Sequence, residues 1–244
     1  EYGLGSQDQV DVLAANDWLD EHAAEPPKAV FGTLATWTAP ARLVDKSPLY
    51  TLHDAPLKRI ARAFPEARYL HLTRSPDAAS RSIARLRQDL GARLGRATAS
   101  DESRAASDLE RFWVEPHRRV CAFLDSVPEH RQRRVRGEDL LTDPPTELRR
   151  IARWLDLSDA TPAIEAMCHP ERWAFASAGP RAARFGCEPG FHERPARRPP
   201  GAAAPAAAPL SREAAALARH FGYADGHPES PASSSTALTS VIHA

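Results

Sequence analysis

Apolar positions recur every three or four residues along several stretches of the chain, a spacing that predicts amphipathic helices. In the first stretch Val10, Leu13, Ala14 and Trp18 fall on one helical face. Polar cap residues and prolines set the limits of each helix, and Pro116 is expected to kink the longest one. The helices are predicted over about residues 7–24, 54–64, 76–93, 103–126, 143–155 and 211–221.

Short runs between these helices predict three strands. They are Arg42–Asp45, Tyr69–Thr73 and Arg133–Arg136. After the second strand, Ser75 supplies a hydroxyl cap, Pro76 fits the first helical position and Asp77 places a carboxylate in the first turn. A strand, a tight turn and a helix in this order form half of a parallel α/β unit, so the predicted fold class is α/β.

The C-terminal part of the chain contains segments with no periodic pattern. Residues 168–209 are rich in Gly, Pro and Arg, which predicts a long covering or functional loop that ends in a Pro/Ala-rich linker at about 199–209. Residues 226–244 form a Ser/Pro/Ala-rich tail that is expected to be disordered. We therefore expect one domain over residues 1–225, followed by this tail.

Charge and length narrow the function classes. The chain has 244 residues, and its 32 basic side chains balance 32 acidic ones, so it lacks the basic excess of a dedicated nucleic-acid-binding domain. A run of arginines between residues 81 and 96 leaves nucleic-acid binding as a minor alternative. No stretch approaches the roughly 20 apolar residues of a membrane span, so we expect a cytoplasmic protein with no membrane partner. The three cysteines are too scattered for a disulfide framework or a zinc site.

The candidate chemistry follows the predicted strands. Arg74 stands where the second strand ends, and Ser82 lies in the next helix on a face that can look back toward that end. Ligands of open α/β sheets bind at the carboxyl ends of strands, and an Arg fork beside a hydroxyl suits a phosphate. The alternative is an Arg paired with a carboxylate and a Ser that faces solvent. Glu138 and Asp139, after the third strand, are expected to anchor the following loop through backbone N–H groups.

Three stretches, in this order, resemble motifs of the sulfotransferase family. They read "VDKSP" (44–48), "FPEARYLHLTRSPDAASRS" (64–82) and "VRGEDLLTDPPTELRRIARWLDL" (135–157). The resemblance covers roughly residues 35–160. The Gly/Pro-rich loop and the last helix also resemble the C-terminal part of bacterial members, including sulfotransferase domains attached to polyketide or peptide synthetases.

The resemblance implies a P-loop-like parallel sheet flanked by helices. It also implies transfer of a sulfuryl group from 3′-phosphoadenosine 5′-phosphosulfate (PAPS) to a hydroxyl or amine of a small-molecule or carrier-bound acceptor, with no metal. Arg74 and Ser82 match the pair that holds the 3′-phosphate of PAPS. Lys46 falls where the family places a polar group facing the transferring sulfuryl group, whose spread negative charge favours positive neighbours. Arg181 and Arg184 lie close to where other members bring a basic segment over the 3′-phosphate.

The chain departs from the family pattern at two positions. Gly137 stands where many members carry an aromatic residue that approaches the adenine, and Pro48 stands where the animal cytosolic branch has its histidine base. The base must then come from elsewhere. His53 and His117 are the candidates, each with a surface or capping role as the alternative. His71 lies inside a strand and is expected to be a packed core histidine.

The family's N-terminal strand and Gly-rich loop, which cradle the 5′-phosphosulfate, have no match between Glu1 and Lys46. We therefore expect a fold truncated at its N-terminus, with unpaired strand edges near Leu43 and Tyr69. The isolated chain is expected to be marginally stable or to oligomerise through those edges, unless an upstream module completes the sheet, and to have little sulfotransferase activity. The alternative function is a catalytically inactive binding or docking module, or a truncated relic of the enzyme.

Overall fold

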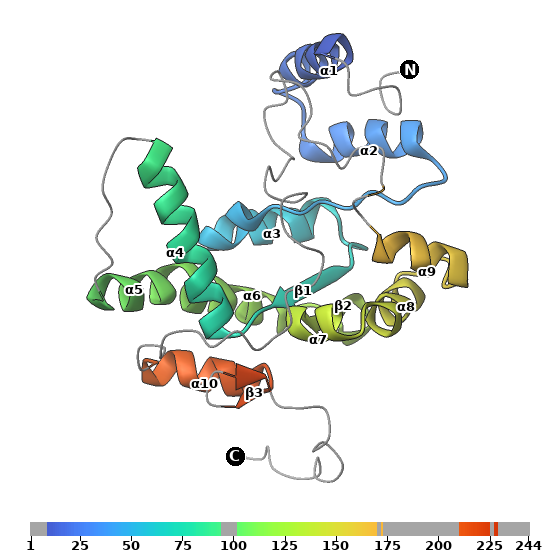
Figure 1. Ribbon diagram of the computed structural model, residues 1–244. Helices are drawn as coiled ribbons and strands as arrows, with labels where there is room; N and C mark the ends of the chain where they lie inside the picture. Colours follow the sequence, from blue (N-terminus) through green and yellow to red (C-terminus); the bar gives the residue numbers. More distant parts are fainter. Residues whose placement is uncertain (1–8, 94–101, 170–171, 173–209, 225–226, 229–244) are drawn as a thin grey trace. The chain divides into compact units, whose positions relative to one another are not determined.

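A computed structural model describes residues 9–93, 102–169, 172, 210–224 and 227–228 (Figure 1). Its helices are α1 (Gln9–Glu21), α2 (Pro27–Thr38), α3 (Asp54–Ala63), α4 (Pro76–Arg93), α5 (Glu102–Leu109), α6 (Glu115–Leu124), α7 (Gly137–Thr142), α8 (Pro144–Trp154), α9 (Thr161–Cys168) and α10 (Arg212–His220). Its strands are β1 (Tyr69–Thr73), β2 (Gln132–Arg136), β3 (Tyr223–Ala224) and β4 (His227–Pro228). Short 3-10 turns lie at Pro48–Leu52 and Glu129–Arg131.

These elements group into two compact units, which are described separately. The first unit comprises Glu1–Leu70, Phe123–Arg133 and Asp139–Ala203. The second unit comprises His71–Ala122, Arg134–Glu138 and Ala204–Ala244. Strands β1 and β2 each run from the first unit into the second, so the carboxyl ends of both strands belong to the second unit.

Strand β1 and helix α4 form where local signals predict them. The strand spans Tyr69–Thr73, and burial alternates along it: His71 and Thr73 are buried, whereas Leu70 and Leu72 are exposed. Helix α4 begins at Pro76, directly after the Ser75 hydroxyl, which accepts a hydrogen bond from the backbone N–H of Ala78 at 3.3 Å. The predicted strand, cap and helix are confirmed.

Strand β1 pairs with β2. Near the carboxyl end of both strands, the Thr73 hydroxyl lies 3.5 Å from the carbonyl oxygen of Val135. Gly137, just beyond β2, approaches the carbonyl oxygen of Thr73 so closely that a Cβ there would lie 3.3 Å from it. The two strands therefore end at the same side and run parallel. This pairing, with helices following each strand, confirms the predicted α/β fold class.

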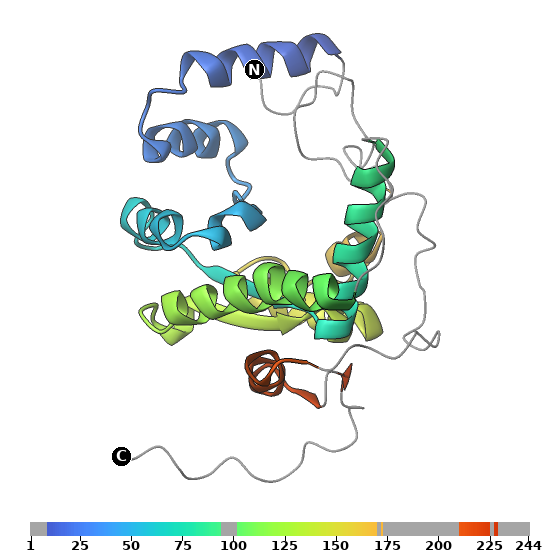
Figure 2. The same ribbon diagram turned by 90° about the vertical axis from the view of Figure 1, so that its left-hand side faces the viewer.

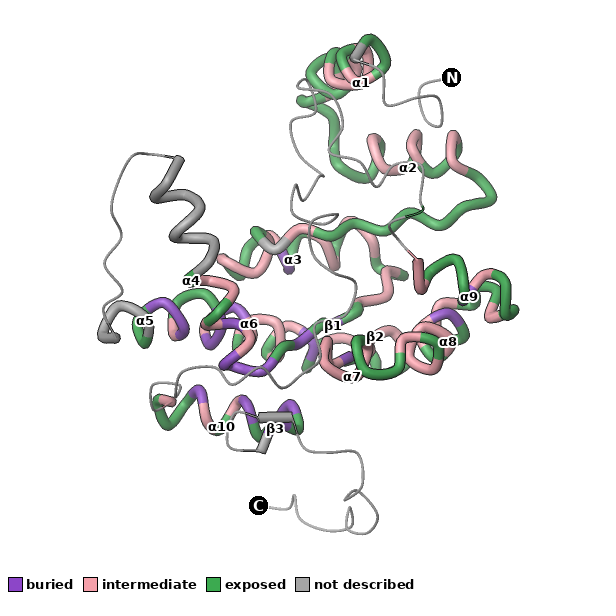
Figure 3. Tube along the Cα trace, viewed as in Figure 1, coloured by how far each residue is buried: buried purple, intermediate pink, exposed green. Residues whose placement is uncertain are grey.

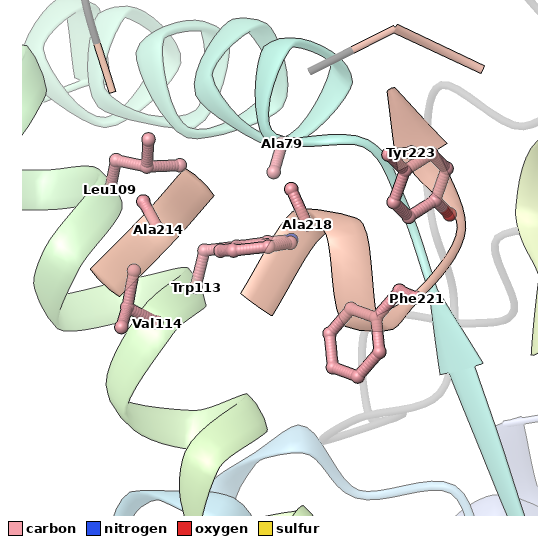
Figure 4. Close-up of a cluster of buried hydrophobic side chains, with 8 residues drawn as sticks. All are labelled: Ala79, Leu109, Trp113, Val114, Ala214, Ala218, Phe221 and Tyr223. Atoms are coloured by element: carbon pink, nitrogen blue, oxygen red, sulfur yellow. The ribbon is translucent and has the colours of Figure 1, made fainter. Parts of the chain in front are cut away.

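In the core of the second unit, α10 and β3 pack against α4, α5 and residues 110–114 (Figures 3 and 4). Its buried members are Ala79, Leu109, Trp113, Val114, Ala214, Ala218, Phe221 and Tyr223. Helix α10 starts as predicted at a serine cap, because the Ser211 hydroxyl accepts from the N–H of Ala214 at 3.0 Å. Small residues on α10 allow close approach, since Ala214 and Ala218 are almost fully buried.

A π-helical turn, Glu110–Val114, joins α5 to α6 in one continuous helical rod (Figure 2). The N–H of Glu115 bonds to the carbonyl of Glu110, five residues earlier, instead of four. Pro116 follows directly and has no N–H to donate, so the wide turn falls where the helical ladder is interrupted. The predicted long helix is confirmed, and a π turn, which was not predicted, lies directly before Pro116, the residue at which a kink was predicted.

In the first unit, aromatic pairs join the N-terminal helices. Trp18 of α1 lies 5.0 Å from Trp37 of α2, and Phe31 of α2 lies 5.3 Å from Phe64 after α3, measured between ring centroids. Helix α8 starts at the predicted cap, where the Asp143 side chain accepts from the N–H of Thr146 at 3.3 Å.

One predicted strand is wrong and three helices were not predicted. Arg42–Asp45 is irregular, and the Val44 side chain is 80% exposed, because an apolar run forms a strand only where a neighbour pairs with it and covers it. Helix α2 was missed because Pro26 and Pro27 suggest a stop, whereas a proline also fits the first helical turn. The short helices α7 and α9 carry too few turns for their periodicity to stand out.

Several other predictions fall on residues outside the described ranges. The predicted loop at 168–209 and the predicted tail at 226–244 lie there almost entirely. Within the described ranges, no helix is long and apolar enough to cross a membrane.

Candidate functional site

The turn between β1 and α4 presents Arg74 at the carboxyl end of the sheet. The Arg74 side chain is exposed, whereas both of its sequence neighbours, Thr73 and Ser75, are buried. The carbonyl oxygen of Arg74 accepts a hydrogen bond from Nε1 of Trp113 at 3.0 Å. Trp113 is 2% exposed and belongs to the core of the second unit. The backbone of Arg74 is thus tied to the core while its guanidinium reaches outward.

Glu138 joins this turn to the C-terminal strand β3. Its Oε1 accepts from the backbone N–H of Ser75 at 2.9 Å, and its Oε2 accepts from the hydroxyl of Tyr223 at 2.8 Å. The Tyr223 hydroxyl also lies 3.2 Å from the hydroxyl of Thr73. Glu138 was expected to anchor the loop that follows it. It does bind a backbone N–H, but that N–H belongs to the turn after β1.

The Tyr223 phenol is fully buried. Burial is the main reason why its pKa lies well above the ordinary value, and the Glu138 carboxylate raises it further. The phenol therefore keeps its proton and acts as a hydrogen-bond donor to the carboxylate.

Gly137 lies against Arg74. A Cβ at this position would come within 3.3 Å of the carbonyl oxygen of Thr73 and 3.5 Å of Cγ of Arg74. An aromatic side chain here would have to point away from both. The tighter of the two neighbours is the backbone carbonyl of Thr73, which favours a residue without a side chain at this position.

The N-terminus of α4 has partners within the protein. The N–H of Ser75 bonds to Glu138, the N–H of Ala78 bonds to the Ser75 hydroxyl, and Pro76 has no N–H. The N–H groups of Ser75 and Ala78 are therefore already used within the protein, and the exposed Arg74 side chain is the positive group at this turn. Ser82 lies further along α4 and is half-buried. Arg74 and Ser82 thus stand on one continuous strand–turn–helix segment of the second unit.

His117 belongs to the same unit and lies in an aromatic cluster. Its Nδ1 lies 2.8 Å from Nε2 of His71, and its ring centroid lies 5.1 Å from those of both Trp113 and Phe221. Burial, with help from Arg134, lowers the pKa of His117 to about 4. His117 is therefore neutral near pH 7 and a weak proton acceptor. The structure places it neither on the surface nor at a helix cap.

His71 is a packed core histidine, as predicted. It is 6% exposed on the inner side of β1, and its ring packs edge-on against Phe221 at 5.4 Å. Burial is the largest cause that lowers the pKa of His71 to about 3, followed by the charges of His117, Arg134 and His220.

The other predicted site residues lie outside the second unit or outside the described residues. Lys46 and His53 belong to the first unit. Lys46 is exposed in an irregular segment, and the exposed His53 precedes α3 without a capping hydrogen bond from its side chain. Arg181 and Arg184 lie outside the described residues. The structure therefore brings Arg74, Ser82 and His117 into one unit.

Tyr223 was missed at the sequence level. It stands 150 residues from Thr73 and 85 from Glu138, and no periodic pattern links such distant positions. The one local signal is Gly222, which ends α10 with a φ of 80° and turns the next side chain inward. Among the described residues, no group of three or more His, Cys, Asp or Glu side chains could hold a metal ion.

Comparisons with known proteins give the family of the chain and support its fold. The profile of the sulfotransferase family matches residues 10–161. The sulfotransferase domain from the curacin biosynthetic pathway is 23% identical, with a TM-score of 0.64, and the match covers 81% of this chain and 68% of that one. The sulfotransferase domain from the Synechococcus PCC 7002 olefin synthase is 24% identical, with a TM-score of 0.63, covering 88% and 70%. At these identities the likeness concerns the fold. No curated protein matches the chain.

Proposed function

This chain belongs to the sulfotransferase family, and on that premise we propose that it binds PAPS and transfers the sulfuryl group to a hydroxyl or amine of an acceptor. The observation that carries the proposal is Arg74, an exposed guanidinium at the carboxyl end of β1 whose backbone is tied to the core. A guanidinium in this place can form paired hydrogen bonds with a phosphate. Ser82, eight residues further, supplies a hydroxyl donor on the following helix.

The proposed reaction joins the acceptor to sulfur and releases a nucleotide. The acceptor oxygen or nitrogen forms a bond to the sulfur, while the bond from sulfur to the bridging oxygen of the phosphosulfate breaks. That oxygen leaves with the electron pair as part of 3′-phosphoadenosine 5′-phosphate (PAP). Negative charge spreads in the transition state, so a nearby cation accelerates the reaction, and we assign this role to Lys46.

The proton of the acceptor passes to a base, and the two candidates differ in environment. His117 is a weak base because burial keeps it neutral and one ring nitrogen is bound to His71. His53 is exposed on the first unit. A loss of turnover in His53→Gln but not in His117→Gln, with nucleotide binding intact in both, would identify His53 as the base.

The two structural neighbours suggest the acceptor class. Both are named as domains of biosynthetic systems, a curacin pathway and an olefin synthase. We propose a biosynthetic intermediate as acceptor, either free or bound to a carrier, with an upstream module or a second copy as structural partner for the sheet.

Binding of PAP tests the nucleotide site without knowledge of the acceptor. Isothermal titration calorimetry should show micromolar binding by the wild-type chain. Arg74→Ala should abolish binding, and Arg74→Lys should retain only part of it because lysine lacks the planar fork. Arg59→Ala is the matched control, since Arg59 is an exposed arginine on α3 of the first unit. No binding by a chain that circular dichroism shows to be folded would overturn the proposal. Binding of PAPS without turnover would favour the inactive docking module.

A further inference from the structure

The peptide bond between Arg74 and Ser75 is held on both sides. Its carbonyl oxygen, which belongs to Arg74, accepts from Nε1 of Trp113 at 3.0 Å. Its N–H, which belongs to Ser75, donates to Oε1 of Glu138 at 2.9 Å. Because a peptide unit is planar, two hydrogen bonds to opposite sides of it fix its orientation. That orientation sets the direction in which the Arg74 side chain leaves the backbone.

Glu138 is itself oriented by a buried phenol. Its second carboxylate oxygen accepts from the Tyr223 hydroxyl at 2.8 Å, and this hydroxyl lies 3.2 Å from the Thr73 hydroxyl. Tyr223 has no exposed surface, so the donor cannot swing away into solvent. Hydrogen bonds to an ionised acceptor are among the strongest in proteins.

Tyr223 is in turn fixed by its surroundings. Gly222 ends α10 at a φ of 80°, which directs the next residue inward, and its carbonyl accepts from the Arg136 guanidinium. The same guanidinium lies over the Tyr223 ring at 5.6 Å from its centroid. The C-terminal segment after α10 is therefore connected, bond by bond, to the turn that carries Arg74.

We propose that Tyr223 and Glu138 are positioning residues that aim Arg74 at the 3′-phosphate of the nucleotide. This inference rests on the proposed function and adds the elements that preorganise its phosphate site. The arrangement also explains why a carboxylate is tolerated close to an anion site. The charge of Glu138 is directed at two donors, the Ser75 N–H and the Tyr223 hydroxyl.

Removal of either partner should weaken the contact with the 3′-phosphate selectively. Tyr223→Phe deletes only the hydroxyl that orients Glu138, so the carboxylate loses one of the two donors that fix its position against the Ser75 N–H. Glu138→Gln keeps the shape but replaces the charged acceptor of the Ser75 N–H by a weaker neutral one. Both changes loosen the Arg74 peptide and leave the rest of the nucleotide site in place.

The test compares two nucleotides that differ in the 3′-phosphate, PAP and adenosine 5′-monophosphate. We expect each variant to weaken PAP binding about tenfold, a factor that corresponds to about 1.4 kcal/mol, with binding of the monophosphate unchanged. The double variant should be no weaker than the poorer single variant, because both residues act through one contact. Ser211→Ala is the matched control, because it removes the cap of α10 but leaves Tyr223 and Glu138 unchanged. In this control the ratio of PAP affinity to adenosine 5′-monophosphate affinity should stay the same.

A ligand-free measurement accompanies the titrations. The amide proton resonance of Ser75 reports its bond to the carboxylate, and it should shift in both Tyr223→Phe and Glu138→Gln. An equal loss for both nucleotides, no loss for either, or the same change in ratio in Ser211→Ala would overturn the positioning role and leave the proposed function standing. Failure of the folded wild-type chain to bind PAP would overturn the proposed function, and the positioning role with it.

Discussion

Protonation of the His71–His117 pair should destabilise the second unit below about pH 6.5, the ordinary pKa of histidine. The pair joins β1 to α6, and Phe221 after α10 packs against both rings. Burial is the main cause that disfavours protonation of both rings, and the charge of Arg134 adds to it at both, after that of His117 at His71. Both pKa values lie below the ordinary one, so the unfolded chain binds more protons than the folded chain. The stabilisation is therefore complete above about pH 6.5 and is lost as the pH falls, down to about 4 for His117 and about 3 for His71.

The magnitude follows from the two pKa values. Folding lowers the pKa of His71 to about 3 and of His117 to about 4. At pH 5 each histidine is 1.5 pH units below its ordinary pKa, and each unit corresponds to about 1.4 kcal/mol, so each contributes a loss of about 2 kcal/mol. The pair together should lower the free energy of unfolding by about 4 kcal/mol between pH 8 and pH 5, a large part of the 5–15 kcal/mol of an ordinary domain.

Urea denaturation at pH 8, 6.5 and 5, followed by circular dichroism, measures this loss. The variant His71→Phe/His117→Leu removes both titrating groups together, so neither ring is left as an unpaired buried polar group. The wild-type chain should lose about 4 kcal/mol more than this variant between pH 8 and pH 5. His53→Gln, at an exposed position, is the control and should follow the wild-type chain. Carboxylates that titrate below pH 5 are common to all three proteins and cancel in the comparison.

Equal losses in the wild-type chain and the double variant would refute the reasoning. A second measurement is independent of unfolding. The ring resonances of His71 and His117 should not titrate above pH 5, and a midpoint near 6.5 for either ring would show that it is solvated or that the contact between them is absent.

Three further predictions concern single positions. In urea titrations, Gly222→Ala should lower the free energy of unfolding by roughly 1–2 kcal/mol, because a side chain is strained at a φ of 80°. Gly32→Ala is the control: a Cβ there meets nothing within 4 Å, so the free energy of unfolding should stay the same or rise. Ser211→Ala should cost about 1 kcal/mol through loss of the α10 cap, measured by the same method, and no change would show that the cap is dispensable. Lys46→Ala should lower PAPS turnover about 100-fold and leave PAP affinity unchanged in calorimetry, and parallel losses of both would contradict a role confined to the transition state.

Local signals explain which parts of the fold the sequence predicts. Between Tyr69 and Pro76 the chain forms β1, the Ser75 cap and the start of α4. Each of these features has a local signal, either the pattern of side chains or a capping residue. The caps at Asp143 and Ser211 were equally local and equally correct. The segment Arg42–Asp45 has strand-forming residues but no strand, because strand formation depends on a partner that lies elsewhere in the chain.

In the candidate site, too, the sequence predicts the residues that are close together in the chain but not the contacts between distant residues. Arg74 and Ser82 lie on one segment, so their spacing is visible in the sequence. The bonds that orient Arg74 come from Trp113, Glu138 and Tyr223, which are distant in sequence and meet only in the folded unit. The sequence could assign Glu138 an anchoring role, but it could not indicate which backbone N–H the carboxylate binds.

The distance between Thr73 and Tyr223 also has a consequence for biosynthesis. The two residues are 150 positions apart, and ribosomes add about 5–20 residues each second, so about 8 to 30 seconds pass between their incorporation. During that interval the nascent chain carries Arg74 on a turn that lacks its final support, and Trp113 lacks the α10 residues that cover it. The turn that carries Arg74 therefore gains its last hydrogen-bonded support, and Trp113 its cover, only after the C-terminal segment has been made.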